Sequence, residues 1–162
     1  MKNHPLYTYL NDHLSGATAA VSLIERCRER YTEGRLGTFF AELHVEVKRD
    51  REALQEVIVR VGGTKNVVKA AAGWLLEKAG RVKLWEAENE ALELLEVLDG
   101  LSLGIQGKRA LWAALDAALE ADERFVGTDF AALKQRAERQ HAEVEEHRLE
   151  AAQRAFAEAA SP

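Results

Sequence analysis

The sequence predicts a single all-helical domain, and three observations support this fold class. The two prolines, Pro5 and Pro162, lie at the ends of the chain, so no proline interrupts a helix between them. Alanine, leucine, glutamate and arginine, which favour helix, are abundant. No segment alternates apolar and polar residues with the β-branched side chains that are typical of a strand. We therefore expect one helical-bundle domain over residues 1–162.

The apolar periodicity and the residues that start or stop helices predict five helices. The first begins at Pro5, a residue that suits a first helical turn. Gly62 and Gly63 end the second helix, and Thr64 can cap a short third helix. The expected ranges are 5–32, 36–61, 64–80, 85–125 and 129–159. Three glycines of the fourth helix are points where it is expected to bend: Gly100, Gly104 and Gly107.

The connection between the second and fourth helices determines the expected topology. Short turns join the first helix to the second and the fourth to the fifth, so each pair should form an antiparallel hairpin. The third helix would be roughly 25 Å long at about 1.5 Å per residue, which lets the second and fourth helices run parallel. Two antiparallel hairpins joined by one long crossover resemble, over the whole chain, the ferritin-like superfamily. The resemblance implies a ferritin-like four-helix bundle.

One motif of this layout concerns metal binding. Ferritin-like di-metal proteins use a Glu from each of two helices and a Glu-x-x-His from each of the other two. Glu138-x-x-His141 has this spacing, but the sequence contains no second copy, and Glu138 points to the flank of its helix. His13 and His141 could instead complete a mononuclear site with Asp50. The candidate iron or manganese ligands are Glu138, His141, Asp50, His13, Glu25 and Glu46.

A different interpretation comes from polar residues in the middle of the apolar stripes. Each long helix carries one, and the choice between neighbours depends on whether the local period is nearer 3.6 or 3.5 residues per turn. A buried charge without a partner costs roughly several kcal/mol, so these residues should pair with each other. An arginine among them would supply positive charge and oppose a metal. The candidates are His13, Asp50, Lys108 or Arg109, and Gln140 or His141.

The favoured prediction is therefore a bundle without cofactor that has a salt-bridged polar core and acts in binding or assembly. An iron or manganese protein, either an oxidoreductase or an iron-handling protein, is the alternative. No nucleophile elbow, phosphate-binding glycine loop or zinc-binding spacing supports an enzyme. The sequence does not identify a small-molecule ligand.

The predicted crossover is strongly basic. Six bases and one acid lie between Arg60 and Lys83, whereas six acids and no base lie between Leu84 and Gly107. Such a helix can bind a membrane surface or a partner, or it can pack across the bundle against the acidic start of the next helix. Packing is the favoured role. The surface-interaction candidates are Lys65, Lys69, Trp74, Lys78, Arg81 and Lys83.

Charge and cysteine content give expectations about partners and compartment. The net charge of −5 argues against nucleic acid as a partner. The single cysteine, Cys27, excludes an intrachain disulfide and favours a reducing compartment. Without a signal-like N-terminus or an apolar run near ~20 residues, we expect a cytoplasmic protein. A homodimer through helix faces is compatible with the sequence, and Phe156 is a candidate contact.

Overall fold

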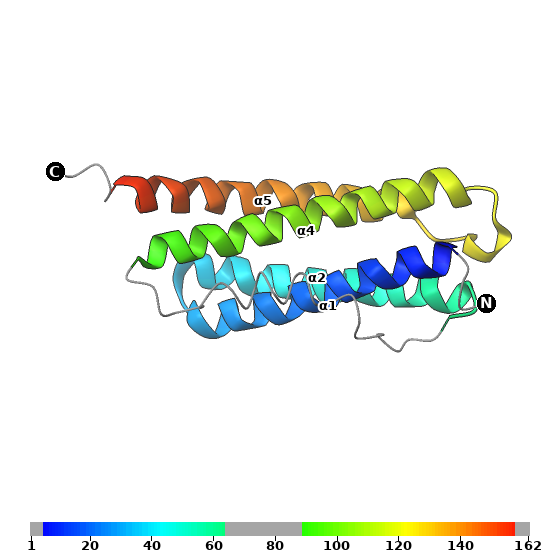
Figure 1. Cartoon of the computed structure of the whole chain (residues 1–162), viewed down its shortest axis with the longest axis horizontal. Helices are drawn as coiled ribbons and strands as arrows, with labels where there is room; N and C mark the ends of the chain where they lie inside the picture. The colour runs from blue at the N-terminus through cyan, green and yellow to red at the C-terminus, as the bar shows by residue number, and fades with distance from the viewer. Residues whose placement is uncertain (1–4, 64–88, 158–162) are drawn as a thin grey trace.

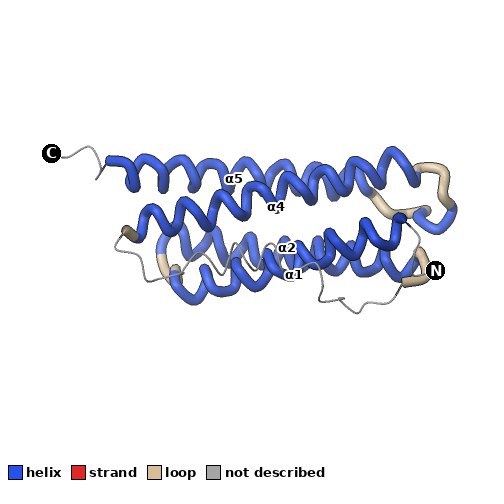
Figure 2. The backbone as a smooth tube through the Cα atoms, in the orientation of Figure 1, coloured by secondary structure: helices blue, strands red, loops and turns tan. Residues whose placement is uncertain are grey.

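The computed structural model describes residues 5–63 and 89–157 (Figure 1). In these two ranges the chain is helical and contains no strand, as Figure 2 shows, so the all-α prediction is confirmed. The elements are α1 (Pro5–Arg30), α2 (Gly34–Arg60), α4 (Glu90–Leu119), the short 3-10 helix η1 (Glu123–Phe125) and α5 (Phe130–Ala157). No helix within the described ranges combines the length and the apolar character that crossing a membrane requires.

The helices form two antiparallel hairpins that lie against each other (Figure 1). One hairpin consists of α1 and α2, and the other of α4 and α5. The helices α2 and α4 run in the same direction, which is the expected relation for hairpins joined by a long crossover. The predicted helix 64–80 and the six surface-interaction candidates lie outside the described residues.

Helix α1 starts at Pro5 as predicted, whereas its end and the bounds of α2 differ from the predicted ones by at most two residues. Helix α1 ends at Arg30, and α2 begins at Gly34, whose φ of +70° suits glycine. The predicted start of the fourth helix at residue 85 lies outside the described residues, but the prediction that Asn89 is helical is wrong. Helix α4 begins at Glu90, because the side chain of Asn89 caps it by accepting a hydrogen bond from the Leu92 N–H at 2.9 Å.

The predicted end of the fourth helix at residue 125 is also wrong. Helix α4 ends at Leu119, and the Asp122 side chain accepts a hydrogen bond from the Arg124 N–H at 3.0 Å, which starts η1. The chain then turns at Gly127, whose φ is +84°. Asp129 accepts a hydrogen bond from the backbone N–H three residues on at 2.8 Å and so caps α5, which begins one residue later than predicted.

The core is packed unevenly between the helices. Helix α5 buries alanines, including Ala137, Ala151 and Ala155, and their small side chains allow α4 to approach α5 closely. These two helices form the most extensive helix pair of the described fold, whereas α1 and α4 make far fewer contacts. Helix α4 runs without interruption through its three glycines, and no described atom lies within 4 Å of a Cβ added at any of them.

Candidate functional site

The centre of the bundle contains a buried carboxylate, Asp50 of α2. It lies on the apolar stripe between Val47 and Leu54, and only 2 % of its surface is exposed. Lys108 Nζ lies 2.5 Å from one carboxylate oxygen of Asp50, and Arg136 Nε lies 2.6 Å from the other. One anion of α2 is therefore bonded by one cation from each helix of the other hairpin.

Gln140 completes this group, which we call the Asp50 cluster: Asp50, Lys108, Arg136, Gln140 and Glu46. The Gln140 side chain is 1 % exposed. Its amide N–H groups donate to Glu46 at 2.8 Å and to Asp50 at 3.1 Å, and its oxygen accepts a hydrogen bond from Lys108. Because its donors and its acceptor all have partners, Gln140 can be buried at little cost.

The electrostatics of the cluster oppose a metal cation. Burial lowers the pKa of Lys108, while the neighbouring carboxylate of Asp50 raises it and stabilises the ammonium. This ammonium lies between the Asp50 carboxylate and the Gln140 oxygen, among the oxygen atoms that a metal would need. Arg136 adds a second positive charge on the other side of Asp50.

The structure brings together only part of the predicted polar core. Asp50, Lys108 and Gln140 meet, whereas Arg109 and His141 do not join them, so for these two residues the predicted convergence is wrong. Neighbouring residues on a helix point about 100° apart, and the side chains of Lys108 and Gln140 take the inward direction. Arg109 is 49 % exposed and pairs with Glu138 at 3.0 Å.

The two predicted core histidines lie elsewhere. His141 lies at the contact of α5 with α4, where its Nε2 is 3.1 Å from both Ser102 Oγ and Gln106 Nε2. His13 of α1 is half-buried and packs edge-to-face on Tyr9, with ring centres 4.7 Å apart. Burial lowers the pKa of His13 and favours the neutral imidazole. Neither histidine is hydrogen-bonded to the Asp50 cluster.

Arg136 was not predicted as part of the core. It lies four residues before Gln140 and therefore on the same face of α5, and this spacing was the signal that could have identified it. The Arg136 side chain is 20 % exposed. In the sequence, its position is that of a charged residue at the solvent-facing edge of the apolar stripe, which is why it was not singled out.

The metal-ligand candidates do not converge. Within residues 5–63 and 89–157, no group of three or more His, Cys, Asp or Glu side chains is placed to hold an ion. Glu138 is exposed and paired with Arg109, Glu46 is bonded to Gln140, and Glu25 is exposed on α1. The residues present therefore do not fit the di-metal or mononuclear site.

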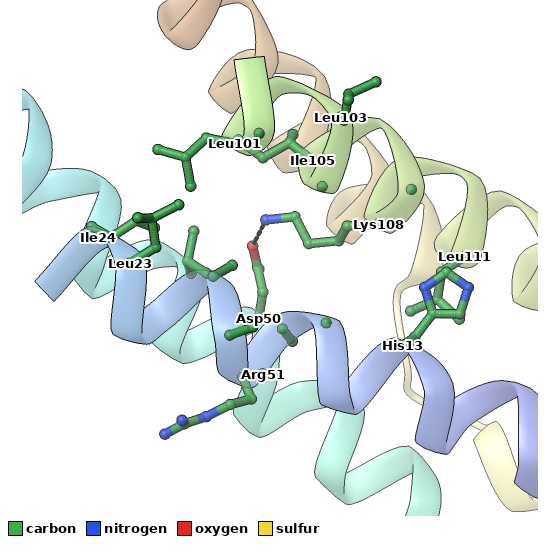
Figure 3. A pocket seen from close by; sticks show the side chains of 18 of the residues that line it. His13, Leu23, Ile24, Asp50, Arg51, Leu101, Leu103, Ile105, Lys108 and Leu111 are labelled. Atoms are coloured by element: carbon green, nitrogen blue, oxygen red, sulfur yellow. Dashed lines mark hydrogen bonds and ion pairs between the residues drawn. The ribbon is translucent and has the colours of Figure 1, made fainter. Parts of the chain in front are cut away.

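A cavity of about 770 Å³ lies beside the cluster, between α1 and α4, with α2 as its floor (Figure 3). We call it the α1–α4 cavity. Asp50 and Lys108 reach toward each other within it. Small residues line this space, and a Cβ added at Gly100, Gly104 or Gly107 would meet no atom of another described residue within 4 Å. Such a volume falls in the range of sites for small organic ligands, about 300–1,000 Å³.

Two residues of the cavity lining each carry a buried polar atom that has no partner among the described residues. The indole Nε1–H of Trp112, whose side chain is fully buried, makes no hydrogen bond. The buried Nε of Arg51 likewise has none. Both groups are donors, and a buried donor without an acceptor is unfavourable.

Comparison of the chain with protein-family models, with curated proteins and with solved structures finds no match. The functional interpretation therefore depends on the Asp50 cluster and the α1–α4 cavity.

Proposed function

We propose that this chain is a ferritin-like bundle with a metal-free, salt-bridged core that acts in binding rather than catalysis. The observation that carries this proposal is the cavity of about 770 Å³ next to a cluster whose charged groups already satisfy one another. A general acid or base needs a proton-transfer path to a substrate, whereas Asp50 is bonded on both oxygens. The Asp50 cluster supports the core, and the cavity is the binding site.

The ferritin-like assignment is supported by the parallel direction of α2 and α4 and by the two antiparallel hairpins. In di-metal members of this arrangement, inward carboxylates and histidines hold the ions. Here an ammonium and a guanidinium surround the one fully buried carboxylate of the described helix centres. This exchange of cations supports the proposal of a metal-free core.

The metal-free core is tested on protein purified without chelators from cells grown with added iron and manganese. We expect metal content well below one ion per chain, and the variant Asp50→Ala should mainly lower the melting temperature. One equivalent of iron or manganese that is lost in Asp50→Ala or His141→Ala would overturn this part of the proposal.

The binding function is tested with Nile red, an uncharged apolar dye whose fluorescence rises in an apolar site. We expect saturable binding with one site per chain. Gly104→Leu should abolish it, because the new side chain extends into the open cavity. Ala142→Leu places the same side chain on the exposed face of α5, outside the cavity, and should leave binding intact. Equal binding by the two variants, or no binding by the native chain, would contradict a binding function for the cavity.

A further inference from the structure

The α1–α4 cavity contains a primary amine. Among the three lysines of the described residues, Lys48, Lys108 and Lys134, only Lys108 lines this cavity. Its side chain extends from α4 into the cavity toward Asp50 (Figure 3), and 13 % of that side chain is exposed. Gly104 lies one helical turn before Lys108, and a Cβ added there would meet no atom of another described residue within 4 Å. A molecule that occupies the cavity therefore lies beside this lysine.

The charged groups in contact with the Lys108 amine balance one another. Asp50 accepts hydrogen bonds from Lys108 on one carboxylate oxygen and from Arg136 on the other. Gln140 links Asp50 to a second carboxylate, that of Glu46. The two cations and the two carboxylates of the Asp50 cluster therefore cancel in charge.

The rest of the described lining adds no unmatched charge that is shielded from solvent. Its other ionisable residues are Asp12, His13, Arg51, Glu96 and Asp99. The three acids are exposed, and Asp99 is also paired with Arg148 at 3.1 Å. Arg51 points away from the cavity (Figure 3), and burial favours the neutral form of His13. Because solvent screens the exposed acids, the apolar lining and the Lys108 amine select the ligand.

Burial favours the nucleophilic form of this amine. Removal from water disfavours the ammonium and lowers the pKa of Lys108, and this effect outweighs the neighbouring carboxylates of Asp50 and Glu46, which raise it. Arg136 lowers the same pKa further. An unprotonated lysine amine in an apolar site is a nucleophile that forms imines with carbonyl compounds. Apolar side chains lie around it: Leu23, Ile24, Leu101 and Ile105 (Figure 3).

We propose that the α1–α4 cavity captures an uncharged apolar aldehyde by forming an imine with Lys108 Nζ. This inference rests on the proposed binding function and adds a covalent attachment site to it. The amine nitrogen bonds to the carbonyl carbon, and the bond from that carbon to oxygen breaks as the oxygen leaves in water. The proton that the ammonium first releases returns to the departing oxygen. The ammonium and the aldehyde thus give a protonated imine and one water molecule, with no oxidant or reductant.

The Asp50 cluster suits the charged product. A protonated imine keeps the positive charge and one N–H on Nζ, and the Asp50 carboxylate oxygen 2.5 Å from this nitrogen can accept that hydrogen. Arg136 remains on the other oxygen of Asp50. The hydrogen bond from Lys108 to the Gln140 oxygen is given up. The carboxylate that stabilises the ammonium thus stabilises the protonated imine in the same way, and the charge of the cluster does not change.

The test treats the full chain at pH 7.5 with a substoichiometric amount of 2-naphthaldehyde and with sodium cyanoborohydride, which reduces an imine to a stable secondary amine. Peptide mass mapping then locates the adducts. We expect labelling of Lys108 to be at least about tenfold faster than labelling of Lys48, an exposed lysine of α2, because the cavity holds the carbonyl beside the amine. Glycolaldehyde, a polar aldehyde, gains little from the apolar lining and should show no such preference.

Matched variants separate capture in the cavity from general amine reactivity. Lys108→Arg keeps a cation beside Asp50 but cannot form an imine, so it should lose the main adduct, whereas Lys48→Arg should keep it. Gly104→Leu retains the lysine but fills the space beside it and should slow the labelling of Lys108 by about tenfold. Excess Nile red should likewise protect Lys108 but not Lys48 in the native chain, and this readout needs no variant.

The outcomes distinguish imine formation from the binding function. Imine capture is overturned if Lys108 is labelled no faster than Lys48, or if neither Gly104→Leu nor Nile red slows its labelling. In both cases saturable binding of Nile red with one site per chain leaves the binding function standing. Absence of both Nile red binding and preferential labelling of Lys108 contradicts the two proposals together.

Discussion

Replacement of Asp50 by alanine is the most informative single perturbation of the bundle. Asp50→Ala removes the anion that Lys108 and Arg136 share inside the protein. Removing one partner from a buried ion pair costs about 3–5 kcal/mol, since the remaining charge stays in the interior without compensation. The Lys108 and Arg136 side chains keep 13 % and 20 % exposure, so both can recruit water. We therefore expect the lower end of the range, about 3 kcal/mol.

The assay is urea unfolding followed by circular dichroism, together with a thermal melt. For a chain of this size, about 3 kcal/mol corresponds to a decrease of about 6–12 °C in melting temperature. The control is Glu138→Ala, which breaks an exposed ion pair with Arg109. Such pairs contribute at most about 1 kcal/mol, so the control should remain close to the native chain.

A second variant tests the cause of the loss. Asp50→Leu combined with Lys108→Met replaces one anion and one cation by apolar side chains, and such replacements of buried pairs are often neutral or stabilising. We expect the double variant to be more stable than Asp50→Leu alone. The reasoning is refuted if Asp50→Ala unfolds within about 0.5 kcal/mol of the native chain, since a buried pair should cost several times more. It is equally refuted if the double variant is no more stable than the single one.

Three further predictions concern pH and glycines. Burial lowers the pKa of His147 in the folded chain, so below about pH 6.5 the unfolded chain binds more protons, and stability should fall from pH 7.5 to 5.5. The urea midpoint should decrease over this range. An equally large decrease in the variant His147→Gln would show that His147 is not its cause. Hydrogen bonds from Arg148 and Ser102 hold the pKa of Glu145 at about 2, so Ser102→Ala should raise that pKa in a carboxyl-carbon NMR titration, and no change would show that this bond is unimportant. Gly37→Ala should destabilise the chain by about 1–3 kcal/mol, because its Cβ would lie 2.9 Å from the backbone of the preceding turn. Gly104→Ala should instead stabilise it by about 0.5–1 kcal/mol, because no described atom lies within 4 Å of an added Cβ and alanine favours helix. Shifts of the urea midpoint in the same direction for both variants would refute this reading.

The helical class and the central acid could be predicted because both depend on local periodicity. Asp50 shares a face with Val47 and Leu54, and any helix through this segment buries all three together. Periodicity also placed a polar residue near the middle of α4, but it could not separate Lys108 from Arg109. Consecutive residues of a helix differ in direction by about 100°, so a small change in helical period moves the inward-facing position from Lys108 to Arg109.

The rest of the site depends on how the two hairpins pack against each other. The apolar stripe of a single helix carries no information about this packing. Arg136 is hydrogen-bonded to Asp50 across a separation of 86 residues in the sequence, so its role appears only when the hairpins are in place. The cavity has a similar origin. Its openness comes from glycines on α4 facing small residues of α1, including Gly16 and Ala17, and the pairing of these two surfaces is a property of the whole bundle.

The two ion pairs that join Asp50 to α4 and α5 also distinguish between alternative alignments of the two hairpins. Leucine, valine and alanine side chains would find apolar neighbours after a slide of one helical turn, about 5.4 Å, so the apolar stripes discriminate weakly between alternative registers. The same slide would carry Lys108 and Arg136 away from Asp50 together and leave the buried carboxylate and the two half-buried cations without these partners. The cluster thus penalises wrong registers far more than it favours the right one, and its main contribution is the uniqueness of the folded state.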